Sequence, residues 1–390
     1  MKTKDMKMLE KPEDYKNWSI LIQHCEVLEG LTDFEKEKAK RAFQFLMEEL
    51  GENFLDDAFN NRHPICQYLI NLAPWTRKWI IWFAEALKEL KEQENYSSLL
   101  NRIKDKNKFG EGLSVLETAY KFSKAGFKIT IDPSADISGR EKVPDLKLID
   151  RNTKENLFVE VSVLGESRIA QDAFQTMQRI TDSLWRSVPF VHYCGRVYKT
   201  LSQPHLESIV KKVKETVEKA KKGNSFQELV IEDVIEIGIA PENDKQLLEK
   251  WAAERGFKVG EFSGPPFNVD EILRTKRAIE KEQKQLPHTH PNILIIRNNN
   301  LFFHIRDIRK VISEIEEEIY EYPHLLIGVI AGKHMGREEN VVFMKDQHVF
   351  VKKSRSDLLV EQYIILLNQF CEHRISPGTI TKIYNAFKNY

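Results

Sequence analysis

Three acidic residues between positions 117 and 160 lie where burial would make an isolated carboxylate costly. Glu117 falls on or beside the apolar face of a predicted helix, 111–125, although an exposed place at the edge of that face is the alternative. Asp145 and Glu160 each fall on a short segment with the apolar and polar alternation of a half-buried strand. Carboxylates that meet in a sheet can bind a divalent cation, so these residues are the first candidates for a functional site.

The spacing of the two strands indicates that Asp145 and Glu160 face each other. If the turn between the strands is centred between Asn152 and Thr153, the two acids are directly opposed on one face of an antiparallel pair. Their Cβ atoms are then roughly 5 Å apart. Two charges so placed repel by on the order of 3 kcal/mol at an effective dielectric constant of about 20. Protonation, a basic neighbour such as Lys147, or a divalent cation would relieve this repulsion. If Glu117 joins them, the set suits Mg²⁺ or Mn²⁺.

These residues also follow one another in a familiar order. The helix that carries Glu117 is followed by Val-Pro-Asp, which ends at Asp145, and by Val-Glu-Val-Ser over 159–162, in a predicted order α-β-β-β-α-β. This arrangement, which covers about a quarter of the chain, resembles the PD-(D/E)xK nuclease superfamily, which includes many restriction endonucleases and repair nucleases. The resemblance implies that Asp145 and Glu160 bind Mg²⁺ or Mn²⁺ and act in catalysis. It also implies that Glu117 completes the metal site and that the Val161 carbonyl is a further ligand.

One position departs from the pattern of this superfamily. The lysine that the family places two residues after the second acid is Ser162 in this chain. A serine hydroxyl can hydrogen-bond a water molecule, but it brings no positive charge to a phosphate. The family is known to move this lysine to a neighbouring element, and Lys147, on the same strand face as Asp145, is the candidate replacement. The alternative is that Lys147 only neutralises the carboxylates or reaches solvent.

The helix predicted over 167–185 carries a polar stripe that includes Gln171, Gln175 and Gln178. In several branches of the superfamily a glutamine on this helix faces the site or contacts the phosphate backbone, which makes these three residues candidates for nucleic-acid binding. The alternative is an ordinary solvated helix face.

The chain is predicted to contain a helical N-terminal domain, 1–108, and a nuclease-like α/β domain, 109–390. The second domain is expected to have a core at about 109–200, an α/β extension at about 201–355 and C-terminal helices over 356–390, the first of them Asp357–Phe370. Helices and strands alternate after the core, which favours parallel, buried strands. The expected fold class is α/β: a restriction-endonuclease-like αβββαβ core in an extended mixed sheet flanked by helices, with an all-α N-terminal region.

The composition is that of a soluble globular chain. Its 390 residues include 59 basic and 59 acidic side chains, a formal net charge of zero, which rules out nucleic-acid binding by bulk positive charge. One compact basic cluster, Lys352, Lys353 and Arg355, is weak evidence for phosphate contact. Four scattered cysteines and an N-terminus without an apolar run favour a reduced, cytoplasmic setting without a membrane anchor.

The absence of a phosphate-binding GxxxxGK[ST] loop, and of GxGxxG, HExxH and GxSxG motifs, lowers the weight of several other enzyme classes. The resemblance implies the activity of a metal-dependent nuclease, endo- or exonuclease, in which Mg²⁺ activates a water molecule, with DNA favoured over RNA on family grounds. The alternative is a nuclease-fold module that has lost catalysis, as Ser162 would suggest, and that binds nucleic acid or a protein. In the nuclease, the helical N-terminal domain and the α/β extension are expected to supply target recognition or a partner surface, and the helical domain is also the expected contact of a homodimer.

Overall fold

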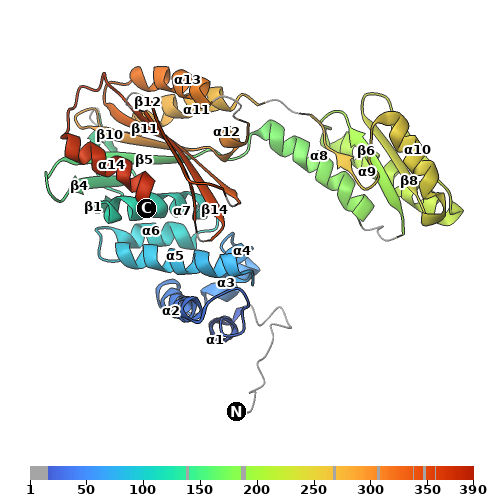
Figure 1. Cartoon of the computed structure of the whole chain (residues 1–390), viewed down its shortest axis with the longest axis horizontal. Coiled ribbons are helices and arrows are strands. Elements are labelled where there is room, and N and C mark those ends of the chain that lie inside the picture. Colours follow the sequence, from blue (N-terminus) through green and yellow to red (C-terminus); the bar gives the residue numbers. More distant parts are fainter. Residues whose placement is uncertain are drawn as a thin grey trace, which may run out of the picture. The chain divides into compact units, whose positions relative to one another are not determined.

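The computed structural model describes residues 16–137, 140–185, 190–266, 269–304, 308–336, 338–345, 348–355 and 357–390. The chain forms two compact units (Figure 1). The main unit combines the chain up to Leu164 with the chain from Glu271 onward, and the inserted unit is formed by Gly165–Asp270. No helix in the described part of the chain is long and apolar enough to cross a membrane.

The main unit begins with a layer of helices. These are α1 (Trp18–His24), α2 (Asp33–Leu50), α3 (Phe54–Asn60), α4 (Cys66–Leu69), α5 (Pro74–Leu90), α6 (Tyr96–Lys104) and α7 (Phe109–Lys124). Helix α2 starts with a capping box, in which Thr32 and Glu35 each bind the other's backbone N–H. The buried Trp79 ring stacks on Tyr68 and Phe83, so this tryptophan fills the helical core.

A sheet of eight described strands follows, in the order β1-β4-β5-β10-β11-β14-β13-β12. The strands are β1 (Phe127–Ile131), β4 (Leu146–Asp150), β5 (Asn156–Val163), β10 (Asn292–Arg297), β11 (Leu325–Met335), β12 (Val341–Lys345), β13 (His348–Ser354) and β14 (Leu359–Leu367). Strands β5, β10 and β11 are parallel neighbours, and the other pairings are antiparallel. A small hairpin, β2 (Ala135–Ile137) and β3 (Arg140–Lys142), separates β1 from β4. The mixed α/β class predicted from the sequence is thus confirmed.

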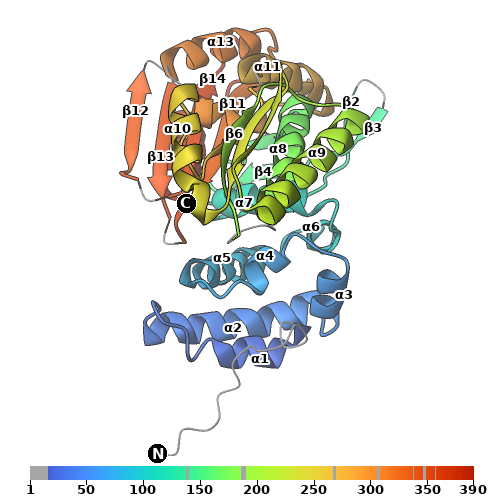
Figure 2. The ribbon, with the colours of Figure 1, turned by 90° about the vertical axis from the view of Figure 1, so that its right-hand side faces the viewer.

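Helices cover both faces of this sheet (Figures 1 and 2). On one face, Val159, Val161 and Ile295 share a core with α5 and α7. On the other, Phe158 and Leu294 pack with α11 (Glu271–Glu282) and α13 (Ile308–Tyr320). The remaining elements of the main unit are η3 (Gln283–Gln285), α12 (Asn299–His304) and α14 (Pro377–Asn389). Because side chains alternate along a strand, neighbouring residues of β5 and β10 belong to different cores.

The inserted unit has its own sheet, in the order β7-β8-β6-β9. Its elements are α8 (Arg168–Trp185), β6 (His192–Val197), α9 (Gln203–Gly223), β7 (Gln227–Ile231), β8 (Ile235–Ala240), η2 (Glu242–Asp244), α10 (Lys245–Arg255) and β9 (Phe262–Ser263). Gly238 lets α10 pack directly on β8, because a Cβ atom there would lie 2.7 Å from Leu248 Cδ1 and 2.8 Å from Trp251 Cε3.

The structure corrects two expectations about elements. The predicted helix Asp357–Phe370 is wrong, because Leu359–Leu367 is strand β14, paired with β11 and β13; only α14 is helical at the C-terminal end. The strand expected at the end of the αβββαβ core is β6, which belongs to the inserted unit and pairs with β8 and β9. In the main sheet, β10 lies beside β5 instead.

The boundary expected near residue 108 does not divide this structure. One continuous hydrophobic core runs from Trp18 through the helices and the sheet to Phe387. The helical layer and the sheet therefore stabilise each other, and the divisions of the chain lie at Leu164/Gly165 and Asp270/Glu271.

This shared core predicts that the helical layer and the main sheet unfold together. Trp79→Ala should lower the free energy of unfolding by about 3–5 kcal/mol, because it removes a buried ring. Amide hydrogen exchange, read by mass spectrometry, should then rise together in α5 and in β10 and β11. Phe34→Ala, at an exposed ring of α2, is the matched control and should change stability by no more than about 0.5 kcal/mol. If amide exchange in Trp79→Ala became fast in α5 while β10 and β11 stayed protected, the shared core would be contradicted.

Candidate functional site

The register of β4 and β5 is the one that the sequence predicts. Leu146 pairs with Val159, and Lys147 pairs with Phe158. The same register places Asp145, one residue before β4, opposite Glu160. Both acids lie near the carboxyl end of β5, and carboxyl ends of parallel strands are where open α/β sheets bind ligands.

Asp145 is buried and is held by two donors. Arg102 Nη1 donates to its Oδ1 at 2.6 Å, and the backbone N–H of Val161 donates to its Oδ2 at 2.9 Å. Strand β4 begins only at Leu146, so the Asp145 carboxylate takes the place of a strand carbonyl as the partner of Val161. Burial raises the pKa of Asp145, and Arg102 and the Val161 N–H oppose that shift.

Glu160 is the less satisfied of the two acids. Its Oε2 atom is buried and has no hydrogen-bond partner in the described structure. Burial, followed by the charges of Asp145 and Glu282, raises the pKa of Glu160 to about 9. A buried carboxyl that lacks a partner for one oxygen is costly unless something outside the chain supplies that partner.

The surroundings of this pair carry more negative than positive charge. Arg102 also forms ion pairs with Asp132 and Glu111, and Lys281 Nζ donates to Glu282 at 2.7 Å. We call these residues the acidic cluster: Glu111, Asp132, Asp145, Glu160 and Glu282, with Arg102 and Lys281. Five carboxyl groups thus lie beside two basic side chains, and the raised pKa of Glu160 means that a further negative charge beside Asp145 is disfavoured unless a cation balances it.

Glu117 does not join this cluster. It lies fully buried on α7, on the face of the sheet that carries Val159 and Val161, whereas Glu160 points to the other face. Arg297 Nη2 donates to its Oε2 at 2.6 Å, and Lys333 binds its Oε1. Among the described residues, no group of three His, Cys, Asp or Glu side chains is arranged to hold a metal ion. The structure therefore does not bring the three predicted carboxylates together.

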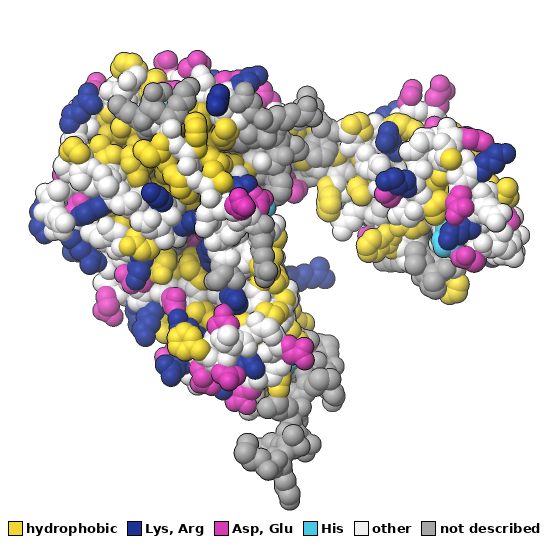
Figure 3. Space-filling view, viewed as in Figure 1, with side chains coloured by type: hydrophobic (Ala, Val, Ile, Leu, Met, Phe, Trp, Pro, Cys, Tyr) yellow, Lys and Arg dark blue, Asp and Glu magenta, His cyan; other side chains and the backbone are white. Residues whose placement is uncertain are grey.

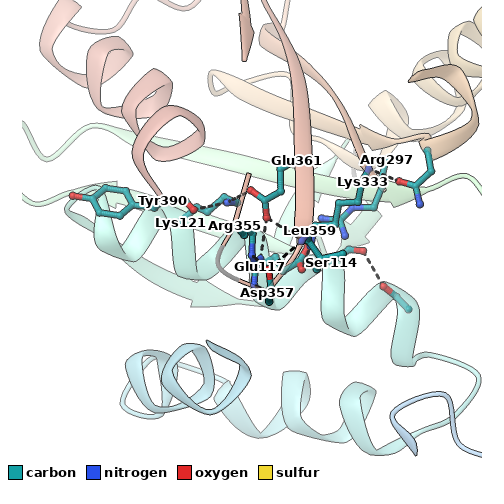
Figure 4. A network of polar contacts seen from close by, with 12 residues as sticks. Ser114, Glu117, Lys121, Arg297, Lys333, Arg355, Asp357, Leu359, Glu361 and Tyr390 are labelled. Atoms are coloured by element: carbon teal, nitrogen blue, oxygen red, sulfur yellow. Dashed lines mark hydrogen bonds and ion pairs between the residues drawn. The ribbon is translucent and has the colours of Figure 1, made fainter. Parts of the chain in front are cut away.

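Glu117 instead belongs to a buried ion network (Figure 4). The second acid of the network is Glu361 on β14. It accepts hydrogen bonds from Lys121 Nζ at 2.9 Å, Arg355 Nη1 at 3.0 Å and Tyr363 Oη at 2.8 Å. Arg355 also binds Asp357 through two nitrogens. We define the ion network as Glu117, Lys121, Arg297, Lys333, Lys353, Arg355, Asp357 and Glu361.

The charges within this network decide which of its groups titrate abnormally. Burial opposes ionisation of Glu117, but Arg297 and Lys333 outweigh it and lower the pKa of that carboxyl to about 2. Glu361 is likewise buried, and Lys121, Arg355 and Lys333 hold its pKa well below the ordinary value. Both acids are therefore charged at neutral pH.

The other predicted residues lie as follows. Lys147 Nζ lies over the Phe158 ring, 5.8 Å from its centre, and no described contact joins it to Asp145 or Glu160. Ser162 pairs with Ile296 across β5 and β10 and is partly buried, on the same face as Glu160. The three glutamines lie on α8 in the inserted unit, and all three are exposed.

Sequence reasoning missed several residues of both clusters. Lys281, Arg297, Lys333 and Glu361 come from elements distant in sequence from residues 109–164, and Arg102 comes from helix α6, just before that segment. The compact cluster around Lys353 was the one available signal, and two of its three members belong to the ion network.

Comparisons with known proteins find no match to this chain. No family model matches it, and neither does any curated protein or solved structure.

Glu361 should contribute to stability in a way that depends on pH. Glu361→Gln leaves buried cations without their partner and should lower the free energy of unfolding at pH 7 by about 3–5 kcal/mol. Because the folded pKa of Glu361 lies below its unfolded value, its contribution is complete above about pH 4.5 and is lost as the pH falls below that value. Urea unfolding between pH 3 and 7 should show that the free energy of unfolding falls less steeply toward low pH in the variant than in the wild type. The exposed Glu339→Gln is the control, and an acid loss equal in Glu361→Gln and the wild type would contradict this role.

Proposed function

We propose that the chain is a metal-dependent nuclease whose metal site is formed around Asp145 and Glu160. The observation that carries this proposal is the buried Glu160 Oε2 atom without a partner, opposite Asp145 in a cluster of five carboxylates and two basic side chains. Oxygen donors of this kind suit Mg²⁺ or Mn²⁺, which take carboxylates and keep several water molecules.

The residues present fit such an ion. Glu160 offers a free oxygen, and each Asp145 oxygen accepts only one described hydrogen bond, so it keeps a second lone pair. A bound Mg²⁺ would activate water and offset charge on a scissile phosphate. Arg102 holds the Asp145 carboxylate in place, and the Val161 N–H fixes its second oxygen against β5.

The connectivity of the main unit also supports this proposal. With the inserted unit, the small hairpin β2-β3 and the short helix η3 set aside, the chain runs α7-β1-β4-β5-α11-β10, which is the order α-β-β-β-α-β. The αβββαβ core expected from the PD-(D/E)xK resemblance is therefore proposed for these elements, with α11 and β10 in the places first given to α8 and β6.

Lys281 is the proposed source of the positive charge that Ser162 lacks. It lies on α11, and its pKa is raised by Glu282, which accepts its hydrogen bond, and further by Glu160. Its side chain is largely exposed, so it can swing toward a bound phosphate. Lys147 is the weaker candidate, because its ammonium group lies over an aromatic ring.

One observation favours the second function, a module that binds nucleic acid without cutting it. Arg102 already neutralises Asp145 at 2.6 Å, and this cation takes part of the charge that a metal would otherwise balance. Ser162 stands where the nuclease superfamily has its lysine, so the acidic cluster of a binding module would stabilise the fold without taking part in catalysis.

Metal binding and cleavage should depend on the same two acids. Calorimetry with Mn²⁺ should show binding to the wild type that is lost in Asp145→Asn and Glu160→Gln, because each replaces a carboxyl group, which can ionise when the cation binds, by a neutral amide. Cleavage of supercoiled plasmid, single-stranded DNA or RNA should fall by more than the roughly 10–100-fold that loss of an outer-shell partner costs.

Glu339→Gln serves as the matched control for both assays, since this glutamate is exposed on the main unit. Cleavage that survives in the Asp145→Asn, Glu160→Gln double variant would overturn the proposed site. Mn²⁺-independent nucleic-acid binding without any cleavage would establish the binding module instead.

Lys281 should affect the chemical step rather than the metal. Lys281→Met should lower the cleavage rate about tenfold or more, as the loss of one electrostatic contact to a reacting phosphate does. The Mn²⁺ affinity of the Lys281→Met variant should not fall, because the substitution removes a positive charge near Glu160 that would repel the cation. Lys284→Met, at an exposed lysine just after the same helix, should behave like the wild type. An unchanged rate in Lys281→Met would exclude Lys281 from catalysis.

A further inference from the structure

The ion network contains more positive than negative side chains. Three carboxylates, Glu117, Asp357 and Glu361, are surrounded by five cations: Lys121, Arg297, Lys333, Lys353 and Arg355. These cations are at most 14% exposed. Lys121 also donates to the Tyr390 main-chain oxygen at 2.7 Å, which compensates part of this excess (Figure 4). The remaining buried positive charge is costly, because neither water nor a carboxylate compensates it fully.

The excess is concentrated at Lys353. The oxygens of Glu361 are already bound by Lys121, Arg355 and Tyr363, and Lys353 Nζ lies 3.6 Å from the nearer oxygen, too far for a hydrogen bond. Burial and then the charge of Lys121 lower the pKa of Lys353 to about 7, against the pull of Glu361. Arg355, which directly follows β13, lowers the pKa of Lys353 further through its positive charge. The fold thus maintains this ammonium group without giving it a full partner.

A hollow of about 590 Å³ adjoins the network. Arg355 lies in its wall beside Trp82, and the guanidinium carbon is 4.3 Å from the centre of that ring. Lys333 Nζ lies 5.8 Å from the same ring. Tyr120 adds aromatic surface to the wall. Lys38 and Lys78 also line the hollow, but they pair with Glu85 and Glu35 of the same wall, so Arg355 supplies the positive charge that is left in excess there. Only three donors of the Arg355 guanidinium have described partners, out of five available.

The network also lies where the sheet would bind a ligand. Arg297 ends β10, Lys333 lies near the end of β11, and Lys353 near the end of β13. These three strands run in the same direction, so their carboxyl ends meet at one edge of the sheet.

We propose that the ion network and the adjoining hollow bind a phosphate monoester dianion, whose negative charge would offset the excess of cations over carboxylates. The phosphate would lie against Arg355 and Lys353, and the hollow beside Trp82 would receive the group that the phosphate carries. Such a group could belong to a free nucleotide or to a phosphorylated end of a nucleic acid. This site is independent of Asp145 and Glu160, which lie on the other side of the sheet.

Sulfate is the suitable first probe, because it remains a dianion across neutral pH. Calorimetry with the full chain should show saturable sulfate binding at pH 6 that weakens as the pH rises through 7 and 8, where Lys353 loses its proton. Lys353→Met should weaken binding at pH 6 roughly tenfold, the effect of removing one charged hydrogen bond, and should flatten the pH dependence. Lys352→Met is the matched control, because Lys352 lies on the opposite face of β13 and binds Glu338.

Thermal unfolding at pH 6 shows whether the weaker sulfate binding of Lys353→Met is caused by a loss of folding. The folded pKa of Lys353, about 7, lies below its unfolded value of 10.5, so the fold loses stability as the pH falls between these values, and the loss is complete at pH 6. Lys353→Met should therefore melt at the same or a higher temperature than the wild type. Sulfate binding that is absent, or equal in Lys353→Met and the wild type, would overturn the proposal.

Competition with sulfate distinguishes the two sources of phosphate. A nucleoside monophosphate that displaces sulfate as well as a 5′-phosphorylated oligonucleotide supports a free nucleotide as the ligand. Stronger displacement by the phosphorylated oligonucleotide supports a nucleic-acid end. An unphosphorylated oligonucleotide that competes equally well would overturn recognition of a monoester. Mn²⁺ binding in Lys353→Met should match the wild type, which separates this site from the proposed metal site.

Discussion

The main unit depends on the pairing of two fully buried carboxylates with cations from distant parts of the chain. Glu117 and Lys121 lie one turn apart on α7, and their partners lie on β10, β11 and β14, about 180 to 240 residues later. Each charge is tolerable inside the protein only while its partners are in place, because a lone buried charge costs several kcal/mol. The contacts in Figure 4 therefore fix α7 in one position on the sheet. They also explain why the helical layer shares one core with the strands.

The same sheet separates charges of opposite sign. Along β5 and β10, alternate residues point to opposite faces, so Glu160 lies on the face of α11 and Arg297 on the face of α7. One face carries an excess of carboxylates and the other an excess of cations, and both lie near the carboxyl ends of the parallel strands. On the surface, acidic and basic side chains are interspersed over the face drawn in Figure 3. A net charge of zero is thus compatible with two strongly charged sites.

Local interactions account for what the sequence predicts correctly. The register of β4 and β5 follows from one short turn, in which Asp150 accepts hydrogen bonds from the N–H groups of Asn152 and Thr153. The partners of Glu117 could not be predicted in this way, since Arg297 and Lys333 reach it only through the fold. Strand β14 was misread because its continuous apolar run, Tyr363–Leu367, has no period that separates a buried strand from a helix. Its two neighbouring strands decide its conformation.

Two ionisable groups near the carboxyl ends of the parallel strands have incomplete partners among the described residues, and they differ in sign. Glu160 Oε2 is buried without a described donor, and the Lys353 ammonium group lies 3.6 Å from Glu361, beyond hydrogen-bond distance. Hydrophobic side chains of similar size would remove both penalties, so packing alone gives no reason for either residue. Strain and unsatisfied groups of this kind concentrate where a ligand completes the structure. A cation at Glu160 and an anion at Lys353 are the two ligands that would do so. Because the sheet lies between them, each can be bound without the other.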